Sequence, residues 1–275
     1  MKLSIAIASD NALPSAFVVF RGFEKSIRDA ALLGYDGVEL ALKNAKEINP
    51  HEIKSLLDET GLQVSCISTG QVFAESGLMF TDEDILKRNE VKRIFKELID
   101  LASEFCPMVN IGRIRGQIEN DEVEAGEKRF MEIIRELCDY AALRNIYLVL
   151  EPVNRYEINF VNSVEEGVCL LKKVNHTNLK LMPDLFHMNI EDVKIGEELS
   201  RNIDYIKYVH IADSNRLAPG WGHTDFIDIF NHLRKVKYNG WLAVEILPKP
   251  EPFMAAKQAI DFLKPFLNHS INNEK

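Results

Sequence analysis

Short apolar runs alternate with longer amphipathic segments along the whole chain, and this alternation constrains the fold more than any other feature. The eight runs, rich in β-branched residues, are Leu3–Ala8, Gly37–Leu40, Val64–Ser68, Met108–Gly112, Ile146–Glu151, Leu179–Pro183, Tyr208–Ala212 and Trp241–Leu247. Segments with apolar residues at helical spacing lie between them, at Glu24–Leu33, Glu83–Glu104, Val123–Leu143, Ser163–Lys173, Asp225–Lys235 and Phe253–Leu267. Eight strands alternating with helices predict a closed (β/α)₈ barrel.

The length of the chain agrees with one such barrel. The sequence has 275 residues, and a barrel of this kind uses about 250. No low-complexity linker divides it, so we expect a single domain over residues 1–267 and a polar tail over 268–275. A doubly wound open sheet is disfavoured, because no GxGxxG follows the first strand and the one glycine-rich stretch, GRIRG (112–116), lacks that spacing.

Charge and cysteine content limit the setting and the partners. Lys and Arg number 33 against 42 Asp and Glu, a net charge of −9 that argues against a nucleic-acid partner. No segment has the apolar length of a membrane span or of a signal peptide. Cys66, Cys106, Cys138 and Cys169 form no metal-binding spacing and lie among apolar residues, so we expect four buried thiols in a cytoplasmic protein.

Four consecutive strands in the second half of the chain each bring one metal-binding side chain to the same end. IYLVLE ends on Glu151, LKLMPD ends on Asp184, YIKYVHI carries His210 and WLAVEI carries Glu245. Any one of them has an ordinary explanation as a loop, helix-cap or core residue. Charges in apolar strands are costly unless they are paired or bound, so four in register indicate a shared metal ion. Three carboxylates and one imidazole suit Mn²⁺, with Mg²⁺ or Co²⁺ as further candidates.

Longer stretches around these residues resemble a known superfamily. EPVNRYE (151–157), DLFHMNIED (184–192), HIADSNRLAPGWGHTDF (210–226) and VEILPKP (244–250) are similar to the xylose-isomerase-like barrels, and within them to the D-tagatose 3-epimerase family of keto-sugar epimerases. GYDGVEL (34–40), STGQ (68–71) and GRIRG resemble its earlier strand ends. The pattern SNRxAPGxGH is most similar to the subgroup with 5-keto-L-gluconate epimerases of inositol catabolism.

The resemblance implies roles for seven residues. It makes Glu151, Asp184, His210 and Glu245 the metal ligands, makes Glu151 and Glu245 the catalytic acid/base pair, and makes Glu157, His187 and Arg216 contacts to substrate oxygens. Glu157 and Arg216 are otherwise surface charges, and His187 is otherwise a helix-cap residue. His223 and Asp225 have two possible roles, contact with the substrate or support of the loop. Glu39 also has two, as a residue that supports the metal ligands from behind or as an ion-pair partner. The resemblance also implies a homodimer or homotetramer.

Two early segments depart from epimerases of simple sugars. Ala12–Gly22 lengthens the loop after the first strand, and GRIRG places Arg113 and Arg115 after the fourth. A guanidinium there suits a keto-sugar acid, such as 5-keto-L-gluconate or D-tagaturonate. Ion pairing of these arginines with the acidic surroundings is the other interpretation.

The hypothesis is an enzyme that epimerises the carbon beside a ketone through a cis-enediolate, with two glutamates as bases. An aldose–ketose isomerase or a dehydratase would use the same barrel and metal. An abasic-site endonuclease would need additional histidines at the early strand ends, which carry Glu39, Ser68 and Gly112 instead. A sugar-binding barrel without chemistry is the alternative from a different class, disfavoured because all four ligands are present.

Overall fold

A ring of parallel strands forms the centre of the molecule. The computed structural model describes residues 1–118 and 122–268. The strands of the ring are β1 (Lys2–Ala8), β3 (Gly37–Ala41), β4 (Gln63–Ser68), β5 (Met108–Ile111), β6 (Tyr147–Leu150), β7 (Leu179–Leu181), β8 (Tyr208–Ile211) and β9 (Trp241–Val244). They follow the order β7-β6-β5-β4-β3-β1-β9-β8, and two parallel bridges, Leu181 with Ile206 and Asp184 with His210, join β7 to β8. The predicted (β/α)₈ barrel is confirmed.

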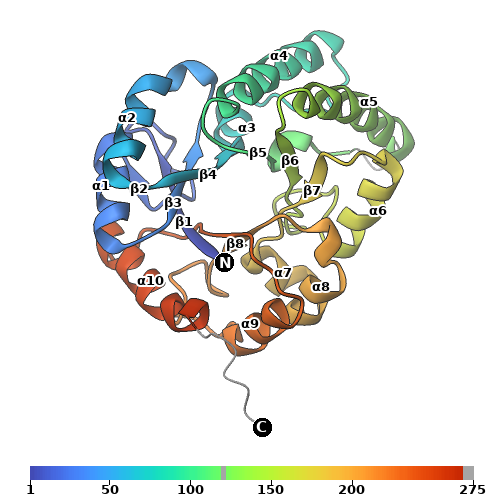
Figure 1. Cartoon of the computed structure of the whole chain (residues 1–275). Helices are drawn as coiled ribbons and strands as arrows, with labels where there is room; N and C mark the ends of the chain where they lie inside the picture. The colour runs from blue at the N-terminus through green and yellow to red at the C-terminus, as the bar shows by residue number, and fades with distance from the viewer. Residues whose placement is uncertain (119–121, 269–275) are drawn as a thin grey trace.

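The helices surround this ring (Figure 1). They are α1 (Phe23–Leu33), α2 (Pro50–Thr60), α3 (Gly70–Ser76), α4 (Ile85–Ala102), α5 (Val123–Ala142), α6 (Val164–Val174), α7 (Leu185–Glu191), α8 (Ile195–Arg201), α9 (Phe226–Lys235) and α10 (Pro252–Asn268). Six match predicted segments. The apolar pattern predicts no helix at α2, α3, α7 or α8, three of which have only seven residues. Too few turns are present in those three for apolar periodicity to emerge.

Local chemistry nevertheless marks the ends of α2. The side chain of Asn49 accepts a hydrogen bond from the backbone N–H of His51, and Pro50 occupies the first turn, where its missing N–H costs nothing. Gly61 ends the helix with a φ of 73°, a left-handed conformation that favours glycine. The helix is therefore specified by its two ends more than by its apolar face.

Alternation along each strand separates two layers of buried side chains. One set of strand residues, including Leu148, Leu150 and Val209, belongs to the large core between strands and helices. The other set fills the inside of the barrel and contains Cys66, Met108, Val149, Met182, Tyr208 and Ala243. Side chains two positions apart on a strand point the same way. A residue two positions after an interior residue therefore also projects into the barrel, at its carboxyl end.

The structure corrects one expectation about the cysteines. Cys66, Cys106 and Cys138 are buried, whereas Cys169 is exposed. Cys169 lies in α6 between the buried Val168 and Leu170, so the apolar letters around it belong to a different face of the helix. Within the described ranges, every helix is too short or too polar to span a bilayer. The polar tail predicted over 268–275 lies, from residue 269 onward, outside the described residues.

Candidate metal centre and substrate pocket

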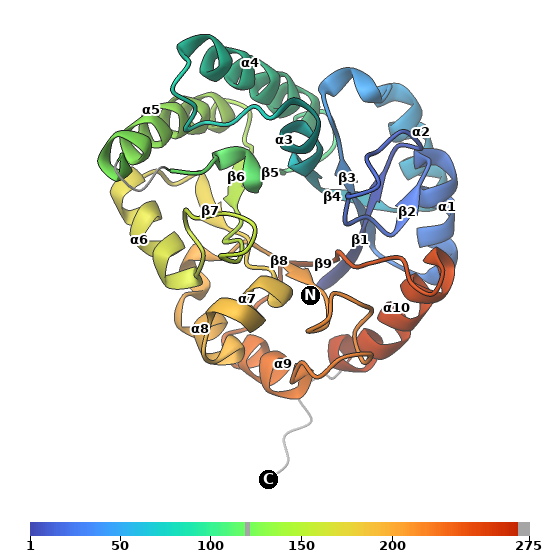
Figure 2. The same ribbon diagram turned by 180° about the vertical axis from the view of Figure 1, so that it is seen from behind.

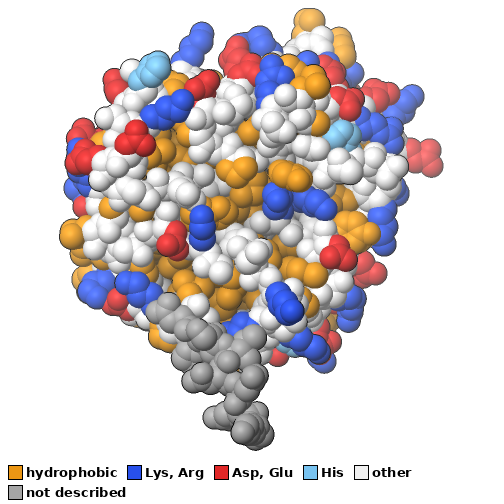
Figure 3. Space-filling view, in the orientation of Figure 1, with side chains coloured by type: hydrophobic (Ala, Val, Ile, Leu, Met, Phe, Trp, Pro, Cys, Tyr) orange, Lys and Arg blue, Asp and Glu red, His pale blue; other side chains and the backbone are white. Residues whose placement is uncertain are grey.

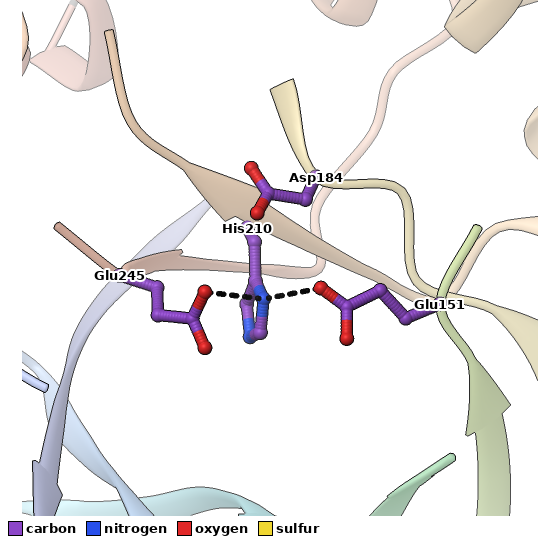
Figure 4. A group of neighbouring side chains, drawn as sticks. All are labelled: Glu151, Asp184, His210 and Glu245. Carbon is purple, nitrogen blue, oxygen red and sulfur yellow. Dashed lines mark ion pairs between the residues drawn. The ribbon is translucent and has the colours of Figure 1, made fainter. Parts of the chain in front are cut away.

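Four side chains converge at the carboxyl end of the barrel. Glu151, Asp184, His210 and Glu245 each offer one ligand atom, and these atoms all lie within 4.8 Å of one another. In Figure 4, Glu151 and Glu245 approach His210 from opposite sides and Asp184 approaches from a third direction. His210 Nδ1 lies 3.4 Å from Glu151 Oε1 and 3.8 Å from Glu245 Oε2. The residues singled out in the sequence are therefore brought together.

Strand alternation and register explain the convergence. Each of the four follows an interior residue by two positions, at Val149, Met182, Tyr208 and Ala243. The backbone N–H of Glu151 donates to Ile111 O at 3.1 Å, and that of Glu245 donates to Ile211 O at 3.2 Å. Sheet hydrogen bonding thus continues past the ends of β6 and β9. The hydrogen-bond ladder that forms the barrel therefore also fixes the backbone positions of Glu151 and Glu245.

The donor set fits a divalent cation. His210 Nδ1 is buried and has no hydrogen-bond partner, while it faces two carboxylates. A buried lone pair aimed at carboxylate oxygens is unfavourable unless a proton or a metal ion lies between them. Asp184 is fully buried and Glu151 nearly so. Oxygen and imidazole ligands without a thiolate suit Mn²⁺, Mg²⁺ or Co²⁺.

The two glutamates differ in electrostatic environment. Burial raises the pKa of Glu245 above its usual value, because a buried carboxylate loses its hydration. Burial acts in the same direction on Glu151, but the adjacent imidazole of His210, together with His187 and Arg216, outweighs it and holds the pKa of Glu151 below its usual value. The two carboxyl groups therefore lie in unlike electrostatic environments.

The three predicted substrate contacts surround the four ligands. His187 Nε2 lies 3.8 Å from Glu151 Oε1 and 3.7 Å from Asp184 Oδ2. Arg216 pairs with Glu245 and lies 3.4 Å from Asp184 Oδ2. Glu157 Oε1 lies 3.8 Å from the Arg216 guanidinium. His187 is in α7 and is buried, so it is not an exposed helix cap, and Arg216 is not a surface cation.

Two aromatic rings hold Arg216 in place. Its guanidinium carbon lies 3.8 Å from the ring centre of Phe17 and 4.7 Å from that of Phe186. Phe17 comes from the segment after β1, which lies on the same side of the barrel as α7 (Figure 2). The backbone of Arg216 has a φ of 59°, and its N–H donates to Asp213 O at 2.8 Å. The long first loop thus covers the site through a cation–π contact.

Comparison with known proteins identifies the family. A family model described as xylose isomerase-like TIM barrel matches residues 27–266. The chain belongs to the xylose isomerase-like TIM barrel family. It is 32% identical over 231 residues to an L-ribulose 3-epimerase of Methylomonas sp. (strain DH-1), a match covering 82% of this chain and 78% of the relative. It is 30% identical over 227 residues to a D-psicose 3-epimerase of Ruminiclostridium cellulolyticum, covering 80% and 76%.

A solved structure shows the same similarity in three dimensions. The crystal structure of D-allulose 3-epimerase from Methylomonas sp. in complex with D-allulose superposes with a TM-score of 0.79 at 26% identity. The match covers 96% of this chain and 98% of that one. These similarities place this xylose isomerase-like barrel among the sugar epimerases, so the expected isomerase class is confirmed.

The two arginines after β5 of this xylose isomerase-like barrel have different environments. Arg113 lines the pocket beside the four ligands, 3.7 Å from Glu157 Oε2 and over the ring of Phe73. Arg115 is fully buried and donates to the backbone oxygens of Gly112, Glu151, Phe160 and Val161. Both expectations for Arg115, contact with a substrate acid and ion pairing with the acidic surroundings, are therefore wrong, because backbone oxygens take up its guanidinium. The short 3₁₀ turn Arg113–Arg115 directs the two side chains apart.

Three polar residues of the site were missed or left unassigned in the sequence. Asn110 Nδ2 donates to Glu151 Oε2 at 3.3 Å, and Asn154 Nδ2 contacts His187 Nδ1 at 2.7 Å. Glu39 contacts His210 Nε2 at 3.0 Å. Asn110 and Glu39 occupy interior-facing positions of β5 and β3. The alternation of inward and outward residues along these strands is the sequence signal that could have identified them. His223 and Asp225 serve local structure, because His223 Nδ1 contacts Ser214 Oγ and Asp225 accepts from Asp228 N at the start of α9.

Proposed function

We propose that the protein is a divalent-metal-dependent 3-epimerase of keto-sugars or keto-sugar acids. The observation that carries the proposal is the pair of carboxylates, Glu151 and Glu245, which flank His210 from opposite sides of one buried site. A divalent ion held by Glu151, Asp184, His210 and Glu245 would polarise the ketone and stabilise the negative charge left when the neighbouring carbon loses its proton.

Epimerisation requires proton transfer on both faces of that carbon. One glutamate removes the proton from one face, and the other delivers a proton to the opposite face, which inverts the configuration. Arg216 lies against Glu245 and Asp184, and His187 lies against Glu151 and Asp184. Both are donors, so they are positioned to hydrogen-bond the oxygens that gain charge in the cis-enediolate. Glu157 would accept a hydrogen bond from a substrate hydroxyl.

The two-base scheme is tested with Glu151→Gln and Glu245→Gln. Each should abolish epimerisation of L-ribulose and D-psicose with Mn²⁺ present, measured by chiral chromatography of the products. Bound metal is quantified in each variant, because both residues are also proposed ligands. One variant should still exchange the α-proton with solvent deuterium through the intact glutamate. Near-normal turnover in either metal-loaded variant would refute the scheme.

The same assay separates the other reaction types. An aldose product would indicate an isomerase, and loss of water would indicate a dehydratase. Sugar binding by the metal-loaded protein without turnover of any substrate would indicate a non-catalytic barrel.

The preferred substrate is proposed to be a keto-sugar acid such as 5-keto-L-gluconate or D-tagaturonate. Arg113 supports this, because its guanidinium lines the pocket and pairs with Glu157 only at 3.7 Å, longer than a charge-assisted hydrogen bond. Arg113→Gln should raise KM for the acids and leave KM for L-ribulose and D-psicose unchanged. An equal effect on acids and neutral ketoses would refute this assignment.

Further parts of the proposal concern the state of the protein. Mn²⁺ is the favoured ion because three carboxylates and one imidazole suit its preference for oxygen and nitrogen ligands. A cytoplasmic setting is supported by the free thiols of Cys66, Cys106 and Cys138. A homodimer or homotetramer is proposed from the resemblance of the motifs, and sedimentation of the purified protein tests it.

A further inference from the structure

A buried hydrogen-bond chain stands behind His210, on the side away from the other three proposed ligands. Its Nε2 lies 3.1 Å and 3.0 Å from the two carboxylate oxygens of Glu39. The hydroxyl of Tyr208 donates to Glu39 Oε2 at 2.7 Å and contacts Ser65 Oγ at 2.6 Å and Ser4 Oγ at 3.2 Å. All five residues are buried, and they come from β1, β3, β4 and β8.

The two ring nitrogens of His210 therefore face different partners. A carboxylate accepts hydrogen bonds, so contact with Glu39 places the imidazole proton on Nε2. The Nδ1 lone pair is then left to face Glu151 and Glu245, where it has no hydrogen-bond donor. A histidine that binds a metal through one nitrogen commonly donates its other N–H to a carboxylate, which fixes both tautomer and ring orientation.

We infer that Glu39 is a positioning residue, which sets the tautomer and orientation of His210 for metal binding while Tyr208 fixes the Glu39 carboxylate. The burial of Glu39 supports this role. Across residues 1–118 and 122–268, its ion-pair contacts within 4.0 Å are to His210 alone. Its register partner on β4 is Cys66, a buried and only weakly polar side chain. A carboxylate is costly in such surroundings, and an apolar side chain would fill the position without that cost.

The inference rests on the proposed metal site, and two substitutions at one position test it. Glu39→Gln keeps the shape and removes the charge, whereas Glu39→Asp keeps the charge and withdraws it from His210. Mn²⁺ is titrated into metal-stripped full-length protein by calorimetry, and the visible spectrum of the Co²⁺-loaded protein reports ligand geometry. We expect both variants to bind Mn²⁺ about 10–100-fold more weakly and to change the Co²⁺ spectrum. Ser4→Ala, at the far end of the chain, should change Mn²⁺ affinity less than two-fold.

The outcomes separate positioning from its alternatives. Wild-type Mn²⁺ affinity in a folded Glu39→Gln protein would overturn the inference. If Glu39→Asp binds Mn²⁺ with wild-type affinity while Glu39→Gln does not, the effect comes from the charge and not from positioning. That result would also overturn the inference. Tyr208→Phe removes one oxygen, so it keeps the test valid if the Glu39 variants do not fold, and it should weaken binding several-fold. Wild-type protein that binds Mn²⁺ but epimerises nothing would refute the proposed function and leave Glu39 testable.

Discussion

Arg115 should contribute more to stability than any exposed charge, because its guanidinium is buried and fully engaged with the backbone. It donates to Phe160 O at 2.6 Å, Glu151 O at 2.6 Å, Val161 O at 2.8 Å and Gly112 O at 3.1 Å. These oxygens belong to the end of β5 and the loop after β6. The arginine therefore joins two neighbouring strand ends at the residue proposed as a catalytic base.

The magnitude follows from the four contacts. A hydrogen bond to a charged group contributes about 1.5–3 kcal/mol, and the desolvation of the guanidinium offsets several kcal/mol of the total. Burial of this guanidinium lowers the pKa of Arg115 to about 10, because the charged form loses its hydration. Arg115→Met keeps most of the volume but removes the side-chain donor from all four carbonyl oxygens; Gly112 O and Val161 O keep backbone N–H donors, from residues 115 and 153. We expect a loss of about 3–5 kcal/mol in the free energy of unfolding.

Urea denaturation followed by circular dichroism measures this loss, with Arg113→Met as the matched control. Arg113 is two residues away, and its side chain is 29% exposed with one long ion pair. Its replacement should cost less than about 1 kcal/mol. Arg115→Lys should recover only part of the stability. It restores the charge, but its ammonium group lacks the planar fork of the guanidinium. Equal stability of Arg115→Met and Arg113→Met would refute the reasoning.

Three further results are expected. Removal of divalent ions with a chelator should abolish epimerase activity. Adding Mn²⁺ at a hundred times its Kd should restore about 2.7 kcal/mol to the free energy of unfolding, and an unchanged Tm would contradict this. Cys169 is exposed and should react rapidly with a thiol reagent. Cys106 and Cys138 are buried, which raises the pKa of each thiol to about 12, so they should react only after unfolding. A single rate for all three thiols would contradict this difference in exposure. Burial raises the pKa of Asp192 to about 7, so its stabilising contribution is complete below about pH 4 and is lost as the pH rises through 7. Asp192→Asn should therefore gain stability over wild type between pH 4 and pH 7, and a constant difference in urea denaturation would refute this.

The residues found from sequence are those whose placement depends on one strand at a time. Glu151 ends an apolar run, and Glu245 follows the apolar residues of β9. Parallel strands bring their carboxyl ends to one edge, so each glutamate could be placed from its own strand alone. Arg113 and Arg115 could not be distinguished in this way. They are two residues apart in GRIRG, and only the 3₁₀ turn directs one into the pocket and the other into the backbone of neighbouring loops. Helix α7, which carries His187, was not predicted because it has too few apolar residues to show a helical period.

The role of Glu39 depends on closure of the whole ring. In the strand order, β1 and β9 separate β3 from β8, so Glu39 reaches His210 across the inside of the barrel. A barrel of eight strands has an interior just wide enough for side chains to fill, which allows this contact. Asn110 on β5 hydrogen-bonds Glu151 just beyond the end of the adjacent strand β6. All four proposed ligands come from the second half of the chain, but the first half orients two of them. A metal site of this geometry therefore requires the closed ring, and the four strands that carry its ligands are not sufficient to form it.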